Sequence, residues 1–233
     1  MMDRPQKILA RGFTLVELLI AMAISLVVLT AISSAFISQR KIYDVEEQNT
    51  QMIQTARGAM DMISSEVKMA GYHFDPTFAN LLQTTDSSTA ATYVGMLYDD
   101  VNNPPQLQIK ADLNSDGETD GTATANDDNE EIIYTEGSTD TIDREEGGTT
   151  ITLAENIEDF SFKYFGSNYD PATETIVDDE IINSTDQERI RVIEITITAR
   201  TSKPDPNYTH PTEGDGYRRY TLTSYITPPN LRN

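Results

Sequence analysis

Hydrophobic positions are distributed in three different ways along this chain of 233 residues. Residues 18–37 include no charged residue, and this run of 20 residues would form a helix of about 30 Å, the thickness of the hydrocarbon core of a bilayer. Over residues 40–69 apolar side chains recur at intervals of three and four, which predicts an amphipathic helix. After Tyr72 short alternating apolar stretches lie between polar segments, which predicts strands and long loops.

The two helical patterns follow one another without a proline, so we expect one long helix, or two nearly collinear helices, from residue 13 to about residue 70, ending at Gly71. The expected buried face consists of the apolar residues Ile42, Val45, Met52, Ile53, Ala56, Met60, Ile63 and Val67. Such a stripe is typical of a helix that packs on a sheet, and much less often of a cofactor groove. Gly58 weakens this helix by up to about 1 kcal/mol relative to alanine.

The alternating stretches after the helix predict the strands of the fold. The expected strands are residues 93–97, 106–111, 131–135, 149–153, 157–165, 189–201 and 217–226. The acidic clusters at residues 143–146 and 178–180 are interpreted as solvated turns. Because strands follow one long helix, we predict an α+β fold in which the helix packs on an antiparallel β-sheet head with long loops.

The charge of the chain narrows the classes of partner and of chemistry. There are 17 Lys and Arg against 38 Asp and Glu, which gives a net charge of −21 at pH 7. Because an acidic surface repels phosphate backbones, we expect no direct contact with nucleic acid. The absence of cysteine excludes disulfides and thiolate metal sites. His73 and His210 have no spaced ligand or nucleophile partner, so the sequence does not predict an enzyme.

The segment before the apolar run indicates how the chain meets a membrane. Arg4, Lys7 and Arg11 are opposed only by Asp3, and by the positive-inside tendency this end stays in the cytoplasm. Three interpretations remain: a secretory signal peptide, a plain signal anchor, and a precursor cleaved on the cytoplasmic side. A secretory signal should reach a small-residue cleavage site after about 7–15 apolar residues. Here a longer run leads into the polar residues 38–41.

Glu17 places a carboxylate one step before the uncharged run. A charge at the centre of a bilayer costs roughly 2.5–3.5 kcal/mol, so a residue of this kind is usually paired or functional. The alternative is a glutamate whose side chain reaches the lipid headgroups beside a plain membrane anchor. The partner of this carboxylate is therefore central to the function of the segment.

The motif from Arg11 to Leu19, Arg-Gly-Phe-Thr-Leu-Val-Glu-Leu-Leu, resembles the type III signal of type IV pilins and pseudopilins. The resemblance implies that a prepilin peptidase cuts after Gly12 on the cytoplasmic face and N-methylates the new first residue, Phe13. It also implies that Glu17 meets the amino terminus of a neighbouring subunit during assembly, which cancels two charges in an apolar filament core.

Other stretches are similar to PilW-type minor pilins and their type II secretion relatives: residues 66–72, 155–160, 191–197 and 217–220. The resemblance implies four segments: a leader peptide at residues 1–12, a transmembrane or filament-core helix at 13–37, an amphipathic continuation of the helix at 38–70 and a β-rich head at 71–233.

The same resemblance implies a minor pilin that acts in initiation or assembly of a type IV pilus. Such a subunit resides in the inner membrane with its head outside the cytoplasm, and later in the pilus at the cell surface. The implied partners are other minor and major pilins, the prepilin peptidase and the inner-membrane assembly platform. A type II secretion minor pseudopilin is the alternative within the class. The alternative from another class is a surface adhesin or binding module anchored by the helix, which tyrosines in polar segments favour: Tyr93, Tyr98, Tyr169 and Tyr208.

A second candidate site lies between two predicted strands. Oxygen-bearing side chains alternate there, with a glycine at the sixth position, as in the first half of an EF-hand calcium loop: Asp112, Asn114, Asp116, Glu118 and Asp120. Ala123 stands where the bidentate glutamate belongs. The missing carboxylate would have to come from the following segment: Asp127, Asp128 or Glu130. The sequence therefore allows either a calcium loop or a polar, acidic turn.

Overall fold

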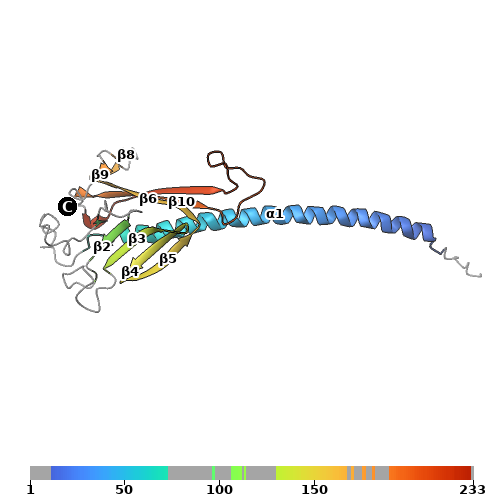
Figure 1. Ribbon diagram of the computed structural model, residues 1–233, viewed down its shortest axis with the longest axis horizontal. Helices are drawn as coiled ribbons and strands as arrows, with labels where there is room; N and C mark the ends of the chain where they lie inside the picture. The colour runs from blue at the N-terminus through green and yellow to red at the C-terminus, as the bar shows by residue number, and fades with distance from the viewer. Residues whose placement is uncertain are drawn as a thin grey trace, which may run out of the picture. The chain divides into compact units, whose positions relative to one another are not determined.

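The computed structural model describes residues 12–72, 96–97, 106–111, 113, 130–166, 169–170, 175–176, 180–181 and 189–231. The chain divides into two compact units, Met1–Glu47 and Gln48–Asn233. The helix α1 (Leu15–Val67) contributes its first part to the first unit and its second part to the second unit, which also contains every described strand (Figure 1). We call the second unit the head.

Helix α1 is a single helix of 53 residues, which confirms the expected long helix. After Val67 the chain leaves the helix through a turn that reaches Gly71. Gly71 has a φ of 75°, the left-handed conformation that glycine adopts at the end of many helices. Its amide donates to the carbonyl of Lys110, the last residue of β2 (Gln106–Lys110), so the end of the helix is fixed to a strand.

The buried face of α1 lies within the head. Its buried residues are Met52, Ala56, Ala59, Met60, Ile63, Glu66 and Val67. The predicted stripe is confirmed from Met52 onward, where Ile53 is half-buried. It is wrong at Ile42, which is 55% exposed, because this residue precedes the part of the helix that belongs to the head. Glu66, a charged residue on the buried face, was not predicted.

Two antiparallel sheets form most of the described head. The first sheet has the order β1-β2-β3-β4-β5 and contains β1 (Met96–Leu97), β2, β3 (Glu131–Gly137), β4 (Thr141–Glu146) and β5 (Thr149–Glu155). The second has the order β11-β10-β6-β9 and contains β6 (Ile157–Phe165), β9 (Glu180–Ile181), β10 (Val192–Arg200) and β11 (Arg219–Ile226). A separate pair is formed by β7 (Tyr169–Asp170) and β8 (Thr175–Ile176), and the short 3-10 helix η4 (Pro229–Leu231) follows β11. A long helix on antiparallel sheets confirms the predicted α+β, pilin-like fold.

The charged segment at residues 143–146 is part of strand β4, so its interpretation as a solvated turn is wrong. Gly147 and Gly148, with φ of 56° and 73°, join β4 to β5, and two successive positive φ values are typical of a tight hairpin turn. Arg144 breaks the expected alternation of apolar and polar residues. It is nevertheless only 7% exposed, because its guanidinium is paired inside the head.

The other strands lie close to their predicted positions. β3 and β5 extend beyond the predicted ends, to Gly137 and Glu155. β11 begins at Arg219, slightly later than predicted. Within the described part of the first predicted strand, Met96 and Leu97 form β1. Glu180 belongs to the short strand β9, which corrects the second predicted turn at this residue, whereas residues 178 and 179 lie outside the described part.

The hydrophobic core of the head combines α1 with both sheets. β10 lies between β6 and β11, and its buried residues alternate as predicted: Ile193, Ile195, Ile197 and Ala199. On β6, Phe160 lies opposite Ile197 and Tyr164 lies opposite Ile193. The first sheet adds Leu107, Ile109, Ile132, Tyr134 and Ile142 to the same core. Because burial of one large aliphatic side chain contributes roughly 1.5–3 kcal/mol, this shared core is the main source of stability for the head.

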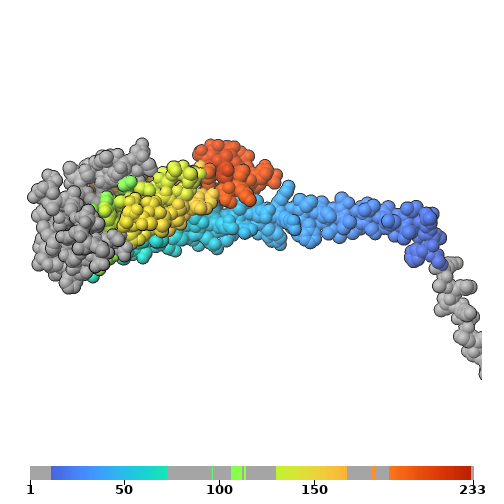
Figure 2. Space-filling view, turned by 60° about the horizontal axis from the view of Figure 1, so that its bottom comes forward, coloured from blue at the N-terminus to red at the C-terminus, as the bar shows by residue number. Residues whose placement is uncertain are grey.

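Residues 201–218, which we call the β10–β11 connection, form a long segment on the surface of the head (Figure 2). The amide of Thr201 donates to the carbonyl of Arg218 at 2.9 Å, so the ladder of the two strands continues into the connection. The amide of Lys203 donates to Oε1 of Gln48, the first residue of the head, at 3.1 Å. The connection is thus fixed both to the sheet and to α1.

Candidate functional site

The predicted processing residues lie just before α1. The position that a Cβ would take at Gly12 has no atom within 4 Å, and the side chain of Phe13 is 88% exposed. Neither residue belongs to the helix, which begins at Leu15. The peptide bond between Gly12 and Phe13 therefore lies in a segment without helical structure that an enzyme can approach.

Glu17 lies in the first turn of α1 and bonds with Thr14. Its Oε2 accepts hydrogen bonds from the amide and from the hydroxyl of Thr14, both at 2.9 Å. The hydroxyl oxygen of Thr14 accepts a bond from the amide of Glu17 at 3.2 Å. This reciprocal pattern is a capping box, which satisfies amides that the first turn of a helix leaves without a helical partner. Thr14 was missed among the site residues, although Thr and Glu three positions apart before an apolar run are the signature of this motif.

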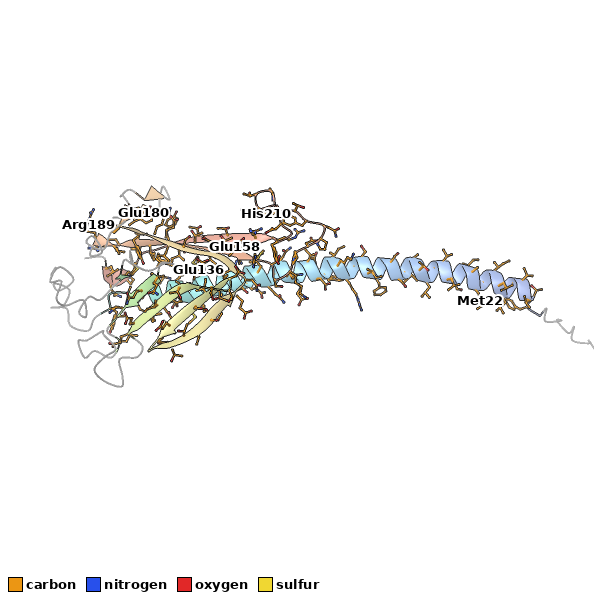
Figure 3. All side chains as sticks on the ribbon, viewed as in Figure 1. Met22, Glu136, Glu158, Glu180, Arg189 and His210 are labelled. Carbon is orange, nitrogen blue, oxygen red and sulfur yellow. The ribbon has the colours of Figure 1, made fainter. Side chains whose placement is uncertain are left out.

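The first unit carries an apolar surface along α1. The helix is long and apolar enough to cross a membrane, with a mean hydropathy of 2.6 over 18 residues, none of them buried. Leu26 is 64% exposed and Phe36 is 62% exposed, and Figure 3 shows side chains projecting from the helix around Met22. Soluble surfaces rarely expose continuous apolar patches larger than a few hundred Å². This part of α1 therefore needs a bilayer or apolar partners around it.

Four polar residues, which we call the Glu66 cluster, join α1 to the first sheet: Glu66, Tyr134, Arg144 and Glu146. Glu66 is 9% exposed, and both of its carboxylate oxygens lie 3.2 Å from Nε of Arg144. Nη2 of Arg144 lies 3.1 Å from Glu66 Oε1, and the hydroxyl of Tyr134 donates to Glu66 Oε2. Arg144 also pairs with Glu146. The helix, β3 and β4 are thereby connected through a single guanidinium and its partners.

The electrostatics of the Glu66 cluster keep Tyr134 protonated and Arg144 charged. Burial and the hydrogen bond to Glu66 raise the pKa of Tyr134 above its ordinary value. Burial by itself lowers the pKa of Arg144, but the hydrogen bonds to Glu146 and Glu66 raise it overall. A buried ion pair that loses one partner leaves an uncompensated charge. The cluster is therefore a permanent connection between the helix and the sheet.

A second group of ion pairs orders the β10–β11 connection. Nη2 of Arg219 lies 2.7 Å from Glu158 Oε1 and 2.7 Å from Asp215 Oδ2. The hydrogen bonds from Arg219 hold the pKa of Asp215 at about 2 and lower the pKa of Glu158. Glu158 is the second residue of β6 and Asp215 lies in the connection, so Arg219 fixes the connection to the second sheet. Figure 3 shows Glu158 in this part of the head.

Tyr208 and His210 make contacts within the connection. The guanidinium of Arg218 lies 4.5 Å from the ring centre of Tyr208 and 3.0 Å from the carboxylate of Asp205. Nδ1 of His210 accepts a bond from the amide of Glu213 at 3.2 Å. These contacts order the connection. The remaining predicted side chains lie outside the described part of the chain: His73, Tyr93, Tyr98 and the side chain of Tyr169.

The predicted calcium ligands all lie outside the described residues: Asp112, Asn114, Asp116, Glu118 and Asp120. Within the described residues, no group of three or more Asp, Glu or His side chains is placed to hold a metal ion. Glu130, one candidate for the missing carboxylate, is 2% exposed, and its Oε1 accepts a bond from the amide of Leu113 at 2.9 Å. The calcium loop stays a prediction.

Residues 9–33 match the family model of the prokaryotic N-terminal methylation motif. Neither the curated proteins nor the solved structures include a match to this chain. The matched segment contains Gly12, Phe13 and Thr14, which lie just before α1, and Glu17, which lies in its first turn. The motif implies processing by a prepilin peptidase and assembly with other pilins, in a class of proteins that are generally structural. The chain therefore combines the N-terminal methylation motif of type IV pilins and pseudopilins with a pilin-like α+β fold.

Proposed function

We propose that the chain is a PilW-type minor pilin that acts in initiation or assembly of a type IV pilus. One observation carries this proposal: the methylation motif, a capped carboxylate and an exposed apolar helix coincide at one end of the chain. A helix of this kind fits a subunit that moves from a bilayer into a filament core, because both surroundings are apolar. The head then remains outside the cytoplasm.

In this proposal the chain is cut after Gly12, and Phe13 becomes the N-methylated first residue. The non-helical segment around both residues supports the cut, since a peptidase needs an accessible peptide bond. The proposed leader is then residues 1–12, and the apolar helix is residues 13–37. Its amphipathic continuation is residues 38–70, and the β-rich segment that follows the helix is residues 71–233.

Glu17 is the proposed assembly residue, and its partner is the amine of Phe13 on a neighbouring subunit. The capping box supports this assignment, because both bonds from Thr14 go to Oε2 and Oε1 can accept a bond from an incoming amine. A methylated amine keeps its positive charge. Pairing of the two charges removes the cost of leaving either of them alone in an apolar filament core.

The same proposal places the protein in the inner membrane as a single-pass precursor and later in the pilus. Its partners are the prepilin peptidase, the assembly platform and other minor and major pilins.

A type II secretion minor pseudopilin is the second candidate, favoured by the same motif, which both systems share. Pilus-assembly genes beside the gene support the first candidate, and secretion genes support the second. A helix-anchored adhesin predicts that deletion leaves normal pili but abolishes attachment.

The processing step is tested by replacing Gly12 with Val and measuring the intact mass of the full-length protein from its host. Gly58→Ala is the matched control, because Gly58 lies on the exposed face of α1 with open space around its Cβ position. We expect the control to have lost residues 1–12 and Gly12→Val to retain them. Equal masses, with the leader present in both proteins, would contradict processing and the pilin assignment.

A further inference from the structure

Among the described strands, the first sheet ends in β1 and β5 and the second in β11 and β9, and β1 and β9 are only two residues long. The two longer terminal strands are β5, which pairs with β4, and β11, which pairs with β10. A terminal strand presents backbone N–H and C=O groups along its outer edge, and these groups can pair with a strand of another molecule. Each of the two edges is therefore a template for an added strand.

The register of β5 identifies which residues face its outer edge. The two-residue turn after β4 makes Glu146 and Thr149 the hydrogen-bonded pair nearest the turn. Backbone groups alternate between the two sides of a strand, so those of Thr150 and Thr152 point to the outer edge. Both threonine side chains are exposed.

The register of β11 identifies which of its residues face the outer edge of the second sheet. The amide of Thr201 donates to the carbonyl of Arg218 at 2.9 Å, which makes this a hydrogen-bonded pair. Counting along the ladder from this pair, the backbone groups of Thr221 and Thr223 point away from β10. Both edges thus offer two exposed threonines at alternate positions.

Both edge strands have a long stretch without the charges and prolines that commonly prevent strand addition, and their charged residues, Glu155 and Arg219, stand at one end of each strand. Residues 149–154 of β5 and residues 220–226 of β11 include no charged residue and no proline. Ile151 of β5 is 49% exposed, although the ladder between β4 and β5 shifts register once, beside Asp143. In a chain with a net charge of −21, an uncharged stretch adds no further like charge to a contact between two copies.

The two strands run in opposite directions along the head. β5 has the direction of β3, since both are antiparallel to β4, and β3 runs toward Glu136. β11 has the direction of β6, since both are antiparallel to β10, and β6 runs from Glu158 toward β9, where Glu180 lies. In Figure 3, Glu180 lies to the left of both Glu136 and Glu158. Two copies in the same orientation therefore bring β5 and β11 together antiparallel.

We propose that β5 of one copy adds as an antiparallel strand to β11 of a second copy of this chain. The proposal rests on the proposed function, because subunits anchored in one membrane by the same helix share one orientation. The contact is heterologous, so it leaves β11 of the first copy and β5 of the second available to further subunits. Backbone bonds provide the attraction, and the threonines at the edges fit a ladder of hydroxyl and methyl groups.

Cysteine cross-linking tests this pairing, because the chain has no cysteine of its own. Full-length Thr152→Cys with one affinity tag is co-expressed in its host with full-length Thr223→Cys carrying another tag. A short bis-maleimide linker is applied to intact membranes. The matched control replaces Thr223→Cys with Ser161→Cys, an exposed residue on β6, which β10 separates from β11 in the second sheet. We expect about tenfold more product carrying both tags from the edge pair than from the control pair.

Other outcomes overturn the pairing. Equal yields from the edge pair and the control pair contradict it, as does a product formed only between two Thr152→Cys chains, which indicates a symmetric β5 contact. If either variant is not folded, as judged by thermal unfolding, Thr150→Cys and Thr221→Cys replace them in the same test. Intact mass is measured on the same samples. Processed protein without the product refutes only the strand pairing, whereas unprocessed protein without the product refutes the proposed function as well.

Discussion

Helix α1 carries a carboxylate near each of its ends, and the two are stabilised in different ways. Glu17 lies among exposed apolar side chains, and its described bonds go to Thr14 of the same helix end. Glu66 lies in the core of the head, where Arg144 and Tyr134 satisfy it. The charge inside the head is thus balanced by the fold itself. Among the described residues, the charge of Glu17 has only the dipolar groups of Thr14 as partners, and we propose that assembly balances it.

The largest effect is expected from Glu17→Gln. Glutamine can keep the capping bonds but removes the charge that the amine of Phe13 needs, so the helix start is preserved and the assembly contact is lost. We expect the amount of protein in sheared pili to fall by about tenfold or more while the membrane fraction is unchanged. Immunoblots of both fractions measure this, with Asp44→Asn on the same helix as the control. Wild-type levels of Glu17→Gln in pili would contradict the assignment.

A smaller but still large effect is expected from Arg144→Met. This change leaves Glu66 buried without its cationic partner, which costs about 3–5 kcal/mol of unfolding free energy in comparable cases. The double variant with Glu66→Met replaces the pair by apolar side chains, so we expect it to recover most of the loss. Denaturant unfolding of the full-length chain in detergent, followed by tyrosine absorbance, measures both. A loss in the double variant as large as that in Arg144→Met alone would show that the unpaired charge of Glu66 is not what destabilises the head.

The ion pairs of the β10–β11 connection predict an effect of acid. The pKa of Asp215 falls from 3.8 to about 2 in the folded state, and that of Glu158 is also lowered. Their stabilisation is therefore complete above the unfolded values and is lost as the pH falls from about 4 toward 2. We expect hydrogen exchange at residues 201–218 to accelerate in this range, and Asp215→Asn to remove much of the pH dependence.

For Glu136, the expected effect of acid on stability has the opposite sign, and the same hydrogen-exchange experiment tests it. Burial and the nearby Asp159 and Asp140 raise its pKa, so protonation favours the folded state and acid stabilises this group. Amides near Glu136 should therefore not follow the acid loosening of the connection. Uniform acceleration across the head would mean that acid acts by global unfolding and not through Arg219.

The smallest effect is expected from Thr14→Val. The change removes the hydroxyl that caps the first turn, and loss of such a cap typically costs about 1 kcal/mol of helix stability. We expect faster hydrogen exchange only in the first turn of α1 in detergent micelles. Thr14→Ser keeps the hydroxyl and is the control. Identical exchange in the two variants would show that the capping box does not stabilise the helix start.

The long helix and most strands could be predicted because their signals are local. Three patterns are visible in neighbouring residues alone: the apolar run that ends at Ile37, the stripe from Met52 to Val67 and the alternation along β10. The N-terminal motif was recognisable for the same reason, since its residues are contiguous. The capping partner Thr14 could also have been found, because its spacing to Glu17 is a known local signal.

The Glu66 cluster could not be predicted, because its contacts join distant parts of the chain. Arg144 is 78 residues away from Glu66 in the sequence. Without knowledge of this ion pair, the charged sequence of β4 indicates an exposed turn, because an unpaired arginine is costly to bury. The same holds for Arg219, whose bonds to Glu158 cross 61 positions. The predicted buried stripe was wrong at its first residue, Ile42, because the periodicity of apolar residues does not show where the head begins.

The central claim is that this chain becomes a filament subunit whose first residue is Phe13. Tandem mass spectrometry of the N-terminal peptide, from protein isolated from its host, tests it most directly. The account predicts a peptide that begins with N-methylated Phe13 and contains Glu17. A mature chain that still carries Gly12, or one that begins after the apolar helix, would contradict it.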